Sequence, residues 1–173
     1  MMVIPSRSYN TLFLDRDGVI NRHRPNDYVK NWDEFEFLPG VLDAFIILAS
    51  YFKHILVVTN QRGVGKGLMT VDDLNQIHQR MVSKIEAYGG RIDKIYYCTD
   101  INNDSVNRKP NPGMAFQAKM DFPDIDFNRS IMIGDSLSDA EFGNNLGMKT
   151  ILISDENPIG NLFEFANFFD SDI

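Results

Sequence analysis

The sequence predicts an α/β fold with a single doubly wound, Rossmann-like and mainly parallel sheet that has helices on both faces. Three observations predict it: short apolar runs recur along the chain, helical patterns separate them, and polar residues directly follow several of the runs. Short runs that are apolar throughout are typical of strands buried on both faces. Alternating strands and helices form parallel sheets, which bind ligands at the carboxyl ends of their strands.

Five apolar runs bounded by turn residues are the expected strands, at 11–14, 55–58, 92–97, 131–133 and 150–153. Helices are expected over 41–51, over the stripe formed by Leu74, Ile77, Met81, Ile85 and Tyr88, over 112–120 and over 138–146. The first follows Pro39, and the stripe has Thr70 as its N-cap. Asn111 and Pro112 resemble the N-cap and first residue of the third helix.

The length of 173 residues fits one domain over 1–173, and we expect no separate substrate domain. An apolar fraction of 43% with 13 phenylalanines is enough to fill a packed interior. The 23-residue stretch 16–38 has neither helical nor strand periodicity. Such long loops are usually functional or disordered.

Composition bears on location and on partners. The longest apolar stretch, 44–49, is far shorter than the roughly 18 to 20 residues of a membrane span. Residues 1–10 lack the pattern of a signal peptide, and the single cysteine suits a reducing compartment, so a cytoplasmic protein is expected. The net charge of −7 disfavours nucleic acid, whose binding depends on neutralising phosphates with lysine and arginine.

Two carboxylates, Asp15 and Asp17, directly follow the first expected strand, and Gly18 permits a sharp turn after them. Close carboxylates repel each other unless one is protonated or a cation lies between them, and oxygen ligands suit Mg²⁺. Asp135 follows the fourth expected strand and is the third candidate ligand. An ordinary solvated turn is the alternative interpretation of the first two acids.

Other polar residues at strand and helix ends are candidates for phosphate binding. Lys109, next to Arg108 and just before a helix, can neutralise a phosphoryl oxygen, although an exposed basic loop is an equal alternative. Thr59 adds a hydroxyl at a strand end. Asp139 either starts a helix and interacts with its dipole or supports the metal site from outside the ligand set.

The glycine-rich segment 63–67 lacks the serine or threonine that a Walker loop requires after its lysine. We expect a flexible turn that directs Asn60, Gln61 and Arg62 towards a ligand. His78 neighbours the apolar helical stripe, which favours a packed histidine over a catalytic one.

Together these residues make the chain resemble the haloacid-dehalogenase-like (HAD) phosphatases. The four matching motifs, in the family's order and spacing, are Asp15-Arg16-Asp17-Gly18, Thr59-Asn60-Gln61, Arg108-Lys109-Pro110 and Gly134-Asp135-Ser136. Segments 13–21, 28–29 and 108–114 resemble more narrowly the D-glycero-D-manno-heptose 1,7-bisphosphate phosphatase and histidinol-phosphatase group. The resemblance covers residues 10–153 and implies a HAD-like fold without a large cap domain. Phosphatases of this kind close an open site with small loops, so the stretch 16–38 is a candidate small lid over the site.

The resemblance implies a role for each matched residue. Asp15 would attack phosphorus to form a phosphoaspartyl intermediate, and Asp17 would be the acid for the leaving group and then the base for water. Asp15, Asp135 and the backbone carbonyl of Asp17 would hold Mg²⁺, and Lys109 and Thr59 would offset phosphoryl charge. The expected substrate contacts are Arg16, Asn60, Gln61, Arg62 and Arg108.

One departure from the group concerns the loop 99–107. Relatives often carry a zinc loop with a Cys-x-His pair and a Cys-x-Cys pair, whereas Cys98 is followed here by Thr-Asp, and Ser105 and Asn107 occupy the later positions. One thiolate without a nearby histidine cannot form a closed tetrahedral zinc site, so we expect no zinc.

The expected substrate is a small phosphorylated metabolite, with heptose 1,7-bisphosphate ahead of histidinol phosphate. A polynucleotide 3′-phosphatase uses a similar core, but an acidic chain without a basic, aromatic stripe is a poor partner for nucleic acid. A phospho-accepting receiver domain also combines aspartates, a threonine and a lysine. Receivers accept the phosphoryl group after a middle strand, whereas the paired acids here follow the first expected strand. The oligomeric state and the preferred anomer are left open.

Overall fold

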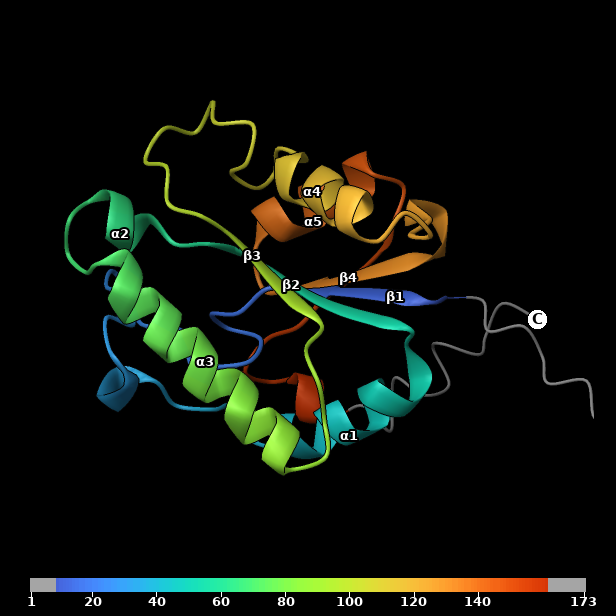
Figure 1. Ribbon diagram of the computed structural model, residues 1–173, viewed down its shortest axis with the longest axis horizontal. Coiled ribbons are helices and arrows are strands. Elements are labelled where there is room, and N and C mark those ends of the chain that lie inside the picture. Colours follow the sequence, from blue (N-terminus) through green and yellow to red (C-terminus); the bar gives the residue numbers. More distant parts are fainter. Residues whose placement is uncertain (1–8, 162–173) are drawn as a thin grey trace, which may run out of the picture.

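The computed structural model of the protein describes residues 9–161 and contains a five-stranded parallel sheet between two layers of helices (Figure 1). The strands are β1 Thr11–Leu14, β2 His54–Asn60, β3 Lys94–Cys98, β4 Ser130–Gly134 and β5 Lys149–Leu152. Their order is β3-β2-β1-β4-β5, so the chain first builds outwards from β1 on one side and then on the other. This is the doubly wound arrangement that the sequence predicts, with its switch point at β1 and β4.

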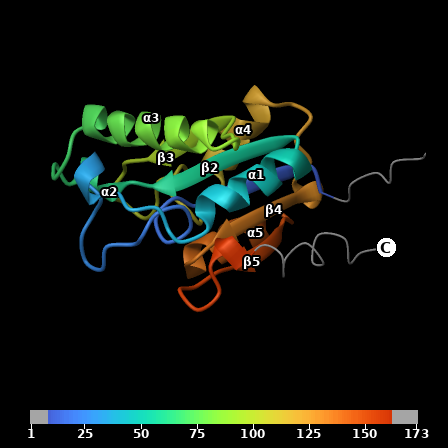
Figure 2. The same cartoon turned by 90° about the horizontal axis from the view of Figure 1, so that it is seen from below.

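The helices cover both faces of the sheet, as Figures 1 and 2 show. Helices α1 Val41–Tyr51 and α3 Val71–Ala87 pack on one face, and α4 Gly113–Asp121 and α5 Leu137–Asn145 pack on the other. The short α2 Arg62–Gly65 follows β2, and three 3₁₀ turns lie at Trp32–Glu34, Phe127–Arg129 and Ile159–Asn161. Leu12 and Leu14 belong to the core under α1 and α3, whereas Phe13 belongs to the core under α4 and α5. This alternation along β1 produces two hydrophobic cores, one on each face.

Three local predictions differ from the structure. The third strand begins at Lys94 and not at Ile92, because Ile92 is buried against the core before the chain pairs with β2. Helix α4 has Pro112 as its N-cap, one residue later than expected. The glycine-rich segment contains the helical turn α2, where a side chain at Gly65 would come within 2.1 Å of the carbonyl oxygen of Thr99. Its glycines therefore permit close packing as well as a turn.

The described residues contribute to one sheet and its covering helices. The single domain predicted over 1–173 also includes residues 1–8 and 162–173, which lie outside the described part. Among the described helices, none has both the length and the apolar character needed to span a membrane.

Candidate active site

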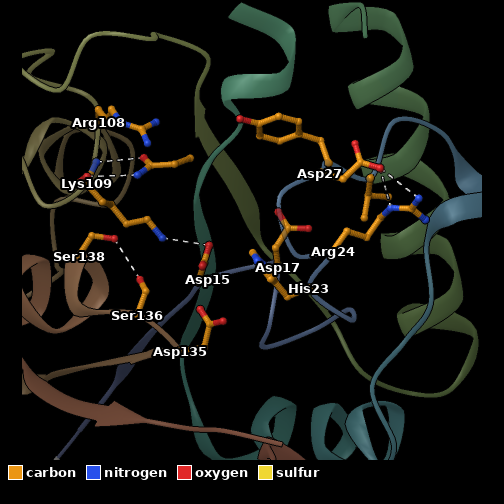
Figure 3. A pocket seen from close by; sticks show the side chains of 13 residues that line it. Asp15, Asp17, His23, Arg24, Asp27, Arg108, Lys109, Asp135, Ser136 and Ser138 are labelled. Atoms are coloured by element: carbon orange, nitrogen blue, oxygen red, sulfur yellow. Dashed lines mark hydrogen bonds and ion pairs between the residues drawn. The ribbon is translucent and has the colours of Figure 1, made fainter. Parts of the chain in front are cut away.

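The expected site residues that lie closest together are at the carboxyl end of the sheet, where β1 and β4 are adjacent. Leu14 pairs with Ile133, and the backbone N–H of Asp15 donates to the carbonyl of Ile133 at 3.0 Å. This register places Asp15, after β1, next to Asp135, after β4. Both line a cavity of about 240 Å³, which Figure 3 shows from close by.

Three carboxylates gather at the base of this cavity. One oxygen from each of Asp15, Asp135 and Asp139 lies within 4.8 Å of the other two. The carboxylate of Asp139 already has partners for both oxygens, since Oδ1 accepts from Lys109 Nζ at 2.6 Å and Oδ2 from the Ser136 hydroxyl at 2.7 Å. Asp139 also completes the capping box that begins α5. Its contact with Ser136 is that of a residue at a helix start. Its contact with Lys109 is compatible with the other alternative, a supporting role outside the ligand set.

Asp15 and Asp135 are the carboxylates that remain for a cation. Oδ1 of Asp15 accepts from the Arg16 backbone N–H at 2.8 Å and lies 2.9 Å from Lys109 Nζ, which leaves Oδ2 for other partners. Burial raises the pKa of Asp15 to about 7. Lys109 opposes this rise, and the negative charges of Asp139 and Asp17 add to it. Burial and Asp139 raise the pKa of Asp135 to about 6. A hard divalent cation supplies the positive charge that these carboxylates lack, so this oxygen set fits Mg²⁺.

Gly18 is required for the close approach of Asp135. Its φ of +84° is a left-handed conformation that other residues seldom adopt. A Cβ at this position would also lie 1.9 Å from Oδ2 of Asp135. The glycine after the paired acids therefore permits both the turn and the closeness of the β4 carboxylate.

Lys109 is the buried cation of the site. Its Nζ lies 2.9 Å from Asp15 and 2.6 Å from Asp139. Burial opposes its charge, but the two carboxylates outweigh that effect, so the pKa of Lys109 is raised. Asn60 fixes the backbone at this residue, because its Oδ1 accepts from the Lys109 N–H at 3.0 Å and its Nδ2 donates to the Lys109 carbonyl at 3.1 Å. Asn60, the last residue of β2, thereby orients the backbone of Lys109.

Asp17 lines the cavity, and donors from three residues surround its carboxylate. Arg16 Nη2 donates to Oδ1 at 2.9 Å and to Oδ2 at 3.1 Å. Asn21 Nδ2 donates to Oδ1 at 2.9 Å, and Gln61 Nε2 donates to Oδ2 at 2.8 Å. Burial by itself raises the pKa of Asp17, but Arg16 and these hydrogen bonds outweigh burial and lower it. The structure therefore shows Asp17 as an oriented carboxylate.

The expected substrate contacts divide into two sets. Asn60 and Arg108 line the cavity. Arg16 and Gln61 lie outside the cavity lining: both side chains are buried and bond to Asp17. In the structure these residues of the first two motifs thus contact each other.

Two further expected residues also lie outside the cavity lining. Arg62 donates to the carbonyl of Ile101 at 2.7 Å and to Oδ1 of Asn103 at 2.6 Å, so it contacts the loop 99–107 in place of a ligand. Thr59 is buried and accepts from Gln61 at 3.0 Å. In this arrangement Thr59 supports the residues around Asp17.

The stretch 16–38, the candidate small lid, contributes one wall of the cavity. The wall is formed by His23, Arg24, Asp27, Tyr28 and Val29, and Ser136 and Ser138 line the cavity near Asp135. The length of that irregular stretch was the available signal, but it did not single out any residue. Ion pairs join Asp27 to Arg24 and Lys30 within this wall. Tyr28 packs so closely on Gly63 that a Cβ there would lie 2.9 Å from its ring.

Comparison with known proteins assigns the family. Over 136 residues the chain is 43% identical to the D-glycero-α-D-manno-heptose-1,7-bisphosphate 7-phosphatase of Mycobacterium bovis, an alignment that covers 78% of this chain and 72% of that protein. The chain belongs to the haloacid-dehalogenase-like phosphatases. The HAD-hydrolase-like family model matches residues 106–157, which include the lysine motif and the Asp135 motif.

Two other members of the HAD phosphatases cover more of the chain. The D-glycero-α-D-manno-heptose-1,7-bisphosphate 7-phosphatase of Campylobacter jejuni is 36% identical over 168 residues, which are 91% of this chain and 94% of that protein. The D,D-heptose 1,7-bisphosphate phosphatase of B. bronchiseptica, solved in complex with magnesium and phosphate, has 31% identity and a TM-score of 0.78. That match covers 91% of this chain and 86% of the other. The predicted HAD phosphatase, with its α/β fold, is therefore confirmed.

Proposed function

We propose that this phosphatase hydrolyses a phosphomonoester of D-glycero-D-manno-heptose 1,7-bisphosphate, with Mg²⁺ as cofactor and a phosphoaspartyl intermediate on Asp15. The convergence of Asp15, Asp135 and Lys109 at one end of the sheet is the observation that carries the chemistry. In this arrangement Asp15 would act as the nucleophile, beside a set of candidate cation ligands and a buried amine. These are the parts that phosphoryl transfer requires, because positioning and charge compensation supply most of its catalysis.

In the first half-reaction, one carboxylate oxygen of Asp15 attacks phosphorus, and the contacts from Lys109 and the Arg16 N–H hold the carboxylate in place. The bond from phosphorus to the sugar oxygen breaks as Asp17 gives a proton to that oxygen. This step requires that the negative charge of the bound phosphate raises the pKa that Arg16 and the hydrogen bonds lower in the free site, so that Asp17 is protonated in the substrate complex. Lys109, next to Asp15, offsets negative charge on the transferring group. Bound Mg²⁺, held by Asp15, Asp135 and the Asp17 carbonyl, would supply Lewis-acid compensation of phosphoryl charge.

In the second half-reaction, Asp17 acts as a base. It removes a proton from water, the water oxygen attacks phosphorus, and the bond from phosphorus to Asp15 breaks. Inorganic phosphate leaves, Asp15 returns as a carboxylate and Asp17 is again protonated. The site orients Asp17 for this step through Arg16, Asn21 and Gln61.

The substrate assignment is supported by the relatives and by the charge of the cavity. Relatives from M. bovis and C. jejuni carry the α-heptose name, whereas one from Rhodopseudomonas palustris, 33% identical, carries the β-heptose name. Arg24 and Arg108 both line the cavity, but Arg24 already pairs with Asp27, so Arg108 is the positive group that suits a second phosphate. Both anomers therefore belong in the substrate test.

Asp15→Asn tests the nucleophile. We expect Mg²⁺-dependent release of phosphate to fall by at least about 10⁴-fold, because an amide cannot form the acyl phosphate. Asp17→Asn should leave an enzyme that accumulates phosphorylated Asp15 or barely turns over. The exposed Asp33, on a 3₁₀ turn outside the cavity, provides the matched control Asp33→Asn, which should retain full activity. Substantial activity in Asp15→Asn would overturn the assignment.

Substrate identity is tested by kcat/KM values for the α and β anomers of heptose 1,7-bisphosphate, for histidinol phosphate and for common sugar phosphates. We expect one heptose bisphosphate anomer to exceed the other substrates by at least about 10²-fold, because monophosphates leave the second cationic group unpaired. Higher kcat/KM for histidinol phosphate would contradict the substrate and leave the nucleophile assignment intact.

A further inference from the structure

A buried histidine lies behind the cavity and outside the four family motifs. His78 belongs to the buried face of α3, together with Leu74, Ile77 and Met81. The prediction that it is packed is confirmed, since the residue is only 7% exposed. Packing alone does not explain its polar contact, because its Nε2 lies 3.2 Å from Nη1 of Arg16.

Arg16 is an unusually costly residue to bury. Its side chain is fully buried, and among the described residues its Nε has no hydrogen-bond partner. A buried guanidinium is tolerated where other groups compensate its charge and its donors. Asp17 compensates the charge through two contacts from Nη2, and His78 accepts from Nη1. The position of the guanidinium thus depends on His78 at Nη1 and on Asp17 at Nη2.

The direction of the hydrogen bond fixes the state of the imidazole. A guanidinium nitrogen only donates, so Nε2 of His78 must be the acceptor and the ring proton must lie on Nδ1. Burial and the positive charge of Arg16 both lower the pKa of His78, to about 3. The ring is therefore neutral at physiological pH and can accept from Arg16.

We propose that His78 is a positioning residue for the reaction assigned above, and that it acts through Arg16 to fix the carboxylate of Asp17. The inference rests on the proposed function, in which Asp17 carries the protons. The chain of contacts runs from the α3 imidazole to the guanidinium and on to the carboxylate that faces the cavity. α3 is a stable anchor for it, because Thr70 and Asp73 form a capping box at its start.

The positioning has a specific consequence for catalysis. Proton transfer needs the carboxylate within hydrogen-bond reach of the leaving oxygen, and a displacement of about 1 Å can cost about 10²-fold in rate. Without the imidazole, Nη1 of Arg16 becomes a second buried donor without a partner, beside Nε. The guanidinium then gains by turning to another acceptor, and Asp17 loses its orientation.

His78→Leu removes the acceptor, and two substrates reveal whether Asp17 is affected. An alkyl phosphate such as a sugar phosphate needs an acid for its leaving alkoxide, whereas p-nitrophenyl phosphate has a good leaving group. We expect kcat/KM to fall by about 10-fold or more for the alkyl phosphate and by less than about 3-fold for p-nitrophenyl phosphate. His78→Gln should recover most of the loss, because the amide oxygen can accept from Arg16.

Leu74→Ala is the matched control, since Leu74 is a buried neighbour on the same face of α3. It should lower stability without changing the ratio of the two kcat/KM values. A wild-type ratio in His78→Leu would reduce His78 to a structural residue. Asp17→Asn separates the two proposals: if it stays active, the proposed function fails, and if it is inactive while His78→Leu keeps the ratio, only the role of His78 fails.

A measurement on the wild-type protein does not depend on any variant folding. The ¹⁵N chemical shifts of the imidazole report which ring nitrogen carries the proton. We expect an unprotonated Nε2 and a protonated Nδ1 for His78 at about pH 7. A proton on Nε2 would overturn the proposal, because that nitrogen could then not accept from Arg16.

Discussion

The base of the cavity and the loop 99–107 lie near each other but are stabilised by different interactions. We call Asp15, Lys109, Asp135 and Asp139 the floor, where three carboxylates surround one buried amine. The floor concentrates like charges, and burial, together with the neighbouring Asp139, raises the pKa values of Asp15 and Asp135 against the opposing charge of Lys109. It is arranged to receive a cation.

The loop 99–107 is stabilised by hydrogen bonds from residues outside it and within it. Arg62 donates to the carbonyl of Ile101 at 2.7 Å, and Asn111 Nδ2 donates to the carbonyl of Ser105 at 2.8 Å. The Ser105 hydroxyl also donates to the carboxylate of Asp100. These contacts order a loop that zinc often orders in relatives of the group. The comparison teaches that like charges dominate the floor, whose carboxylates fit a cation, whereas hydrogen bonds within the protein hold the loop.

The largest effect is expected from Lys109→Met, which removes the only cation of the floor. Breaking a buried ion pair leaves carboxylates without compensation and costs about 3–5 kcal/mol of unfolding free energy. We also expect kcat/KM to fall by about 10²- to 10³-fold, because a donor aimed at developing charge is lost. Urea unfolding and phosphate release measure the two losses.

Lys94→Met is the control for a lysine outside the floor. Its Nζ lies 2.7 Å from Asp121, but the side chain is 46% exposed, so the pair should contribute at most about 1 kcal/mol. Equal stability of the two variants would show that burial does not distinguish the floor from the surface.

Gly18→Ala should have the next largest effect, because it combines backbone strain with a collision. A left-handed alanine costs roughly 1–2 kcal/mol, and displacing Asp135 should bring the total to about 3 kcal/mol. Gly67→Ala is matched, since Gly67 has a φ of +71° but no atom within 4 Å of the added Cβ. Activity should fall only in Gly18→Ala, measured at saturating Mg²⁺. A loss of activity in both variants would contradict a local role for Asp135.

Much of the floor could be predicted from the sequence, because Asp15 and Asp135 directly follow strands, Lys109 lies shortly before a helix and Asp139 lies in the first turn of one. Asp15 and Asp135 are fixed by the parallel register of β1 and β4, which apolar runs already indicate. The role of Arg16 could not be predicted in this way. Its partner His78 lies 62 residues away on α3, and only the packing of that helix brings the two together.

The side-chain contacts of the wall from 16–38 and of the loop 99–107 could not be predicted from the sequence either. Their residues make side-chain contacts without a repeating pattern, such as Tyr28 on Gly63 and Arg62 on Ile101. Neither contact follows helix or strand periodicity, so no spacing in the sequence marks it. Elements can be predicted from periodicity, whereas contacts between irregular segments depend on the finished fold.

A smaller effect should follow from metal removal and should depend on pH. Without Mg²⁺, the folded-state pKa values of about 7 for Asp15 and about 6 for Asp135 exceed those of the unfolded chain. At these two groups the folded state then binds more protons, so their contribution to stability is greatest at low pH and is lost as pH rises through those values. Bound Mg²⁺ should add about 2.7 kcal/mol at 100 times its Kd, and more at about pH 7 than at about pH 5.

Urea unfolding with and without Mg²⁺ at the two pH values measures this effect. Asp135→Asn should lose most of the stabilisation by Mg²⁺, whereas hydrogen exchange in the loop 99–107 should be the same with and without the metal. A change in the exchange of this loop would show that the two regions share a metal-dependent element and would break the comparison.

The smallest effect is expected from Cys98→Ala, which removes the one thiol at the start of the loop. Cys98 is buried, and its Sγ lies 3.9 Å from the Ser105 hydroxyl, so we expect a loss of about 1 kcal/mol and activity within about 2-fold of wild type. Ser105→Ala removes the hydroxyl that donates to Asp100 and should speed hydrogen exchange in the loop more than Cys98→Ala does. Zinc bound to the purified wild-type protein, or a large loss of activity in Cys98→Ala, would show that the loop uses a metal after all, since a thiolate ligand contributes far more than a packed thiol.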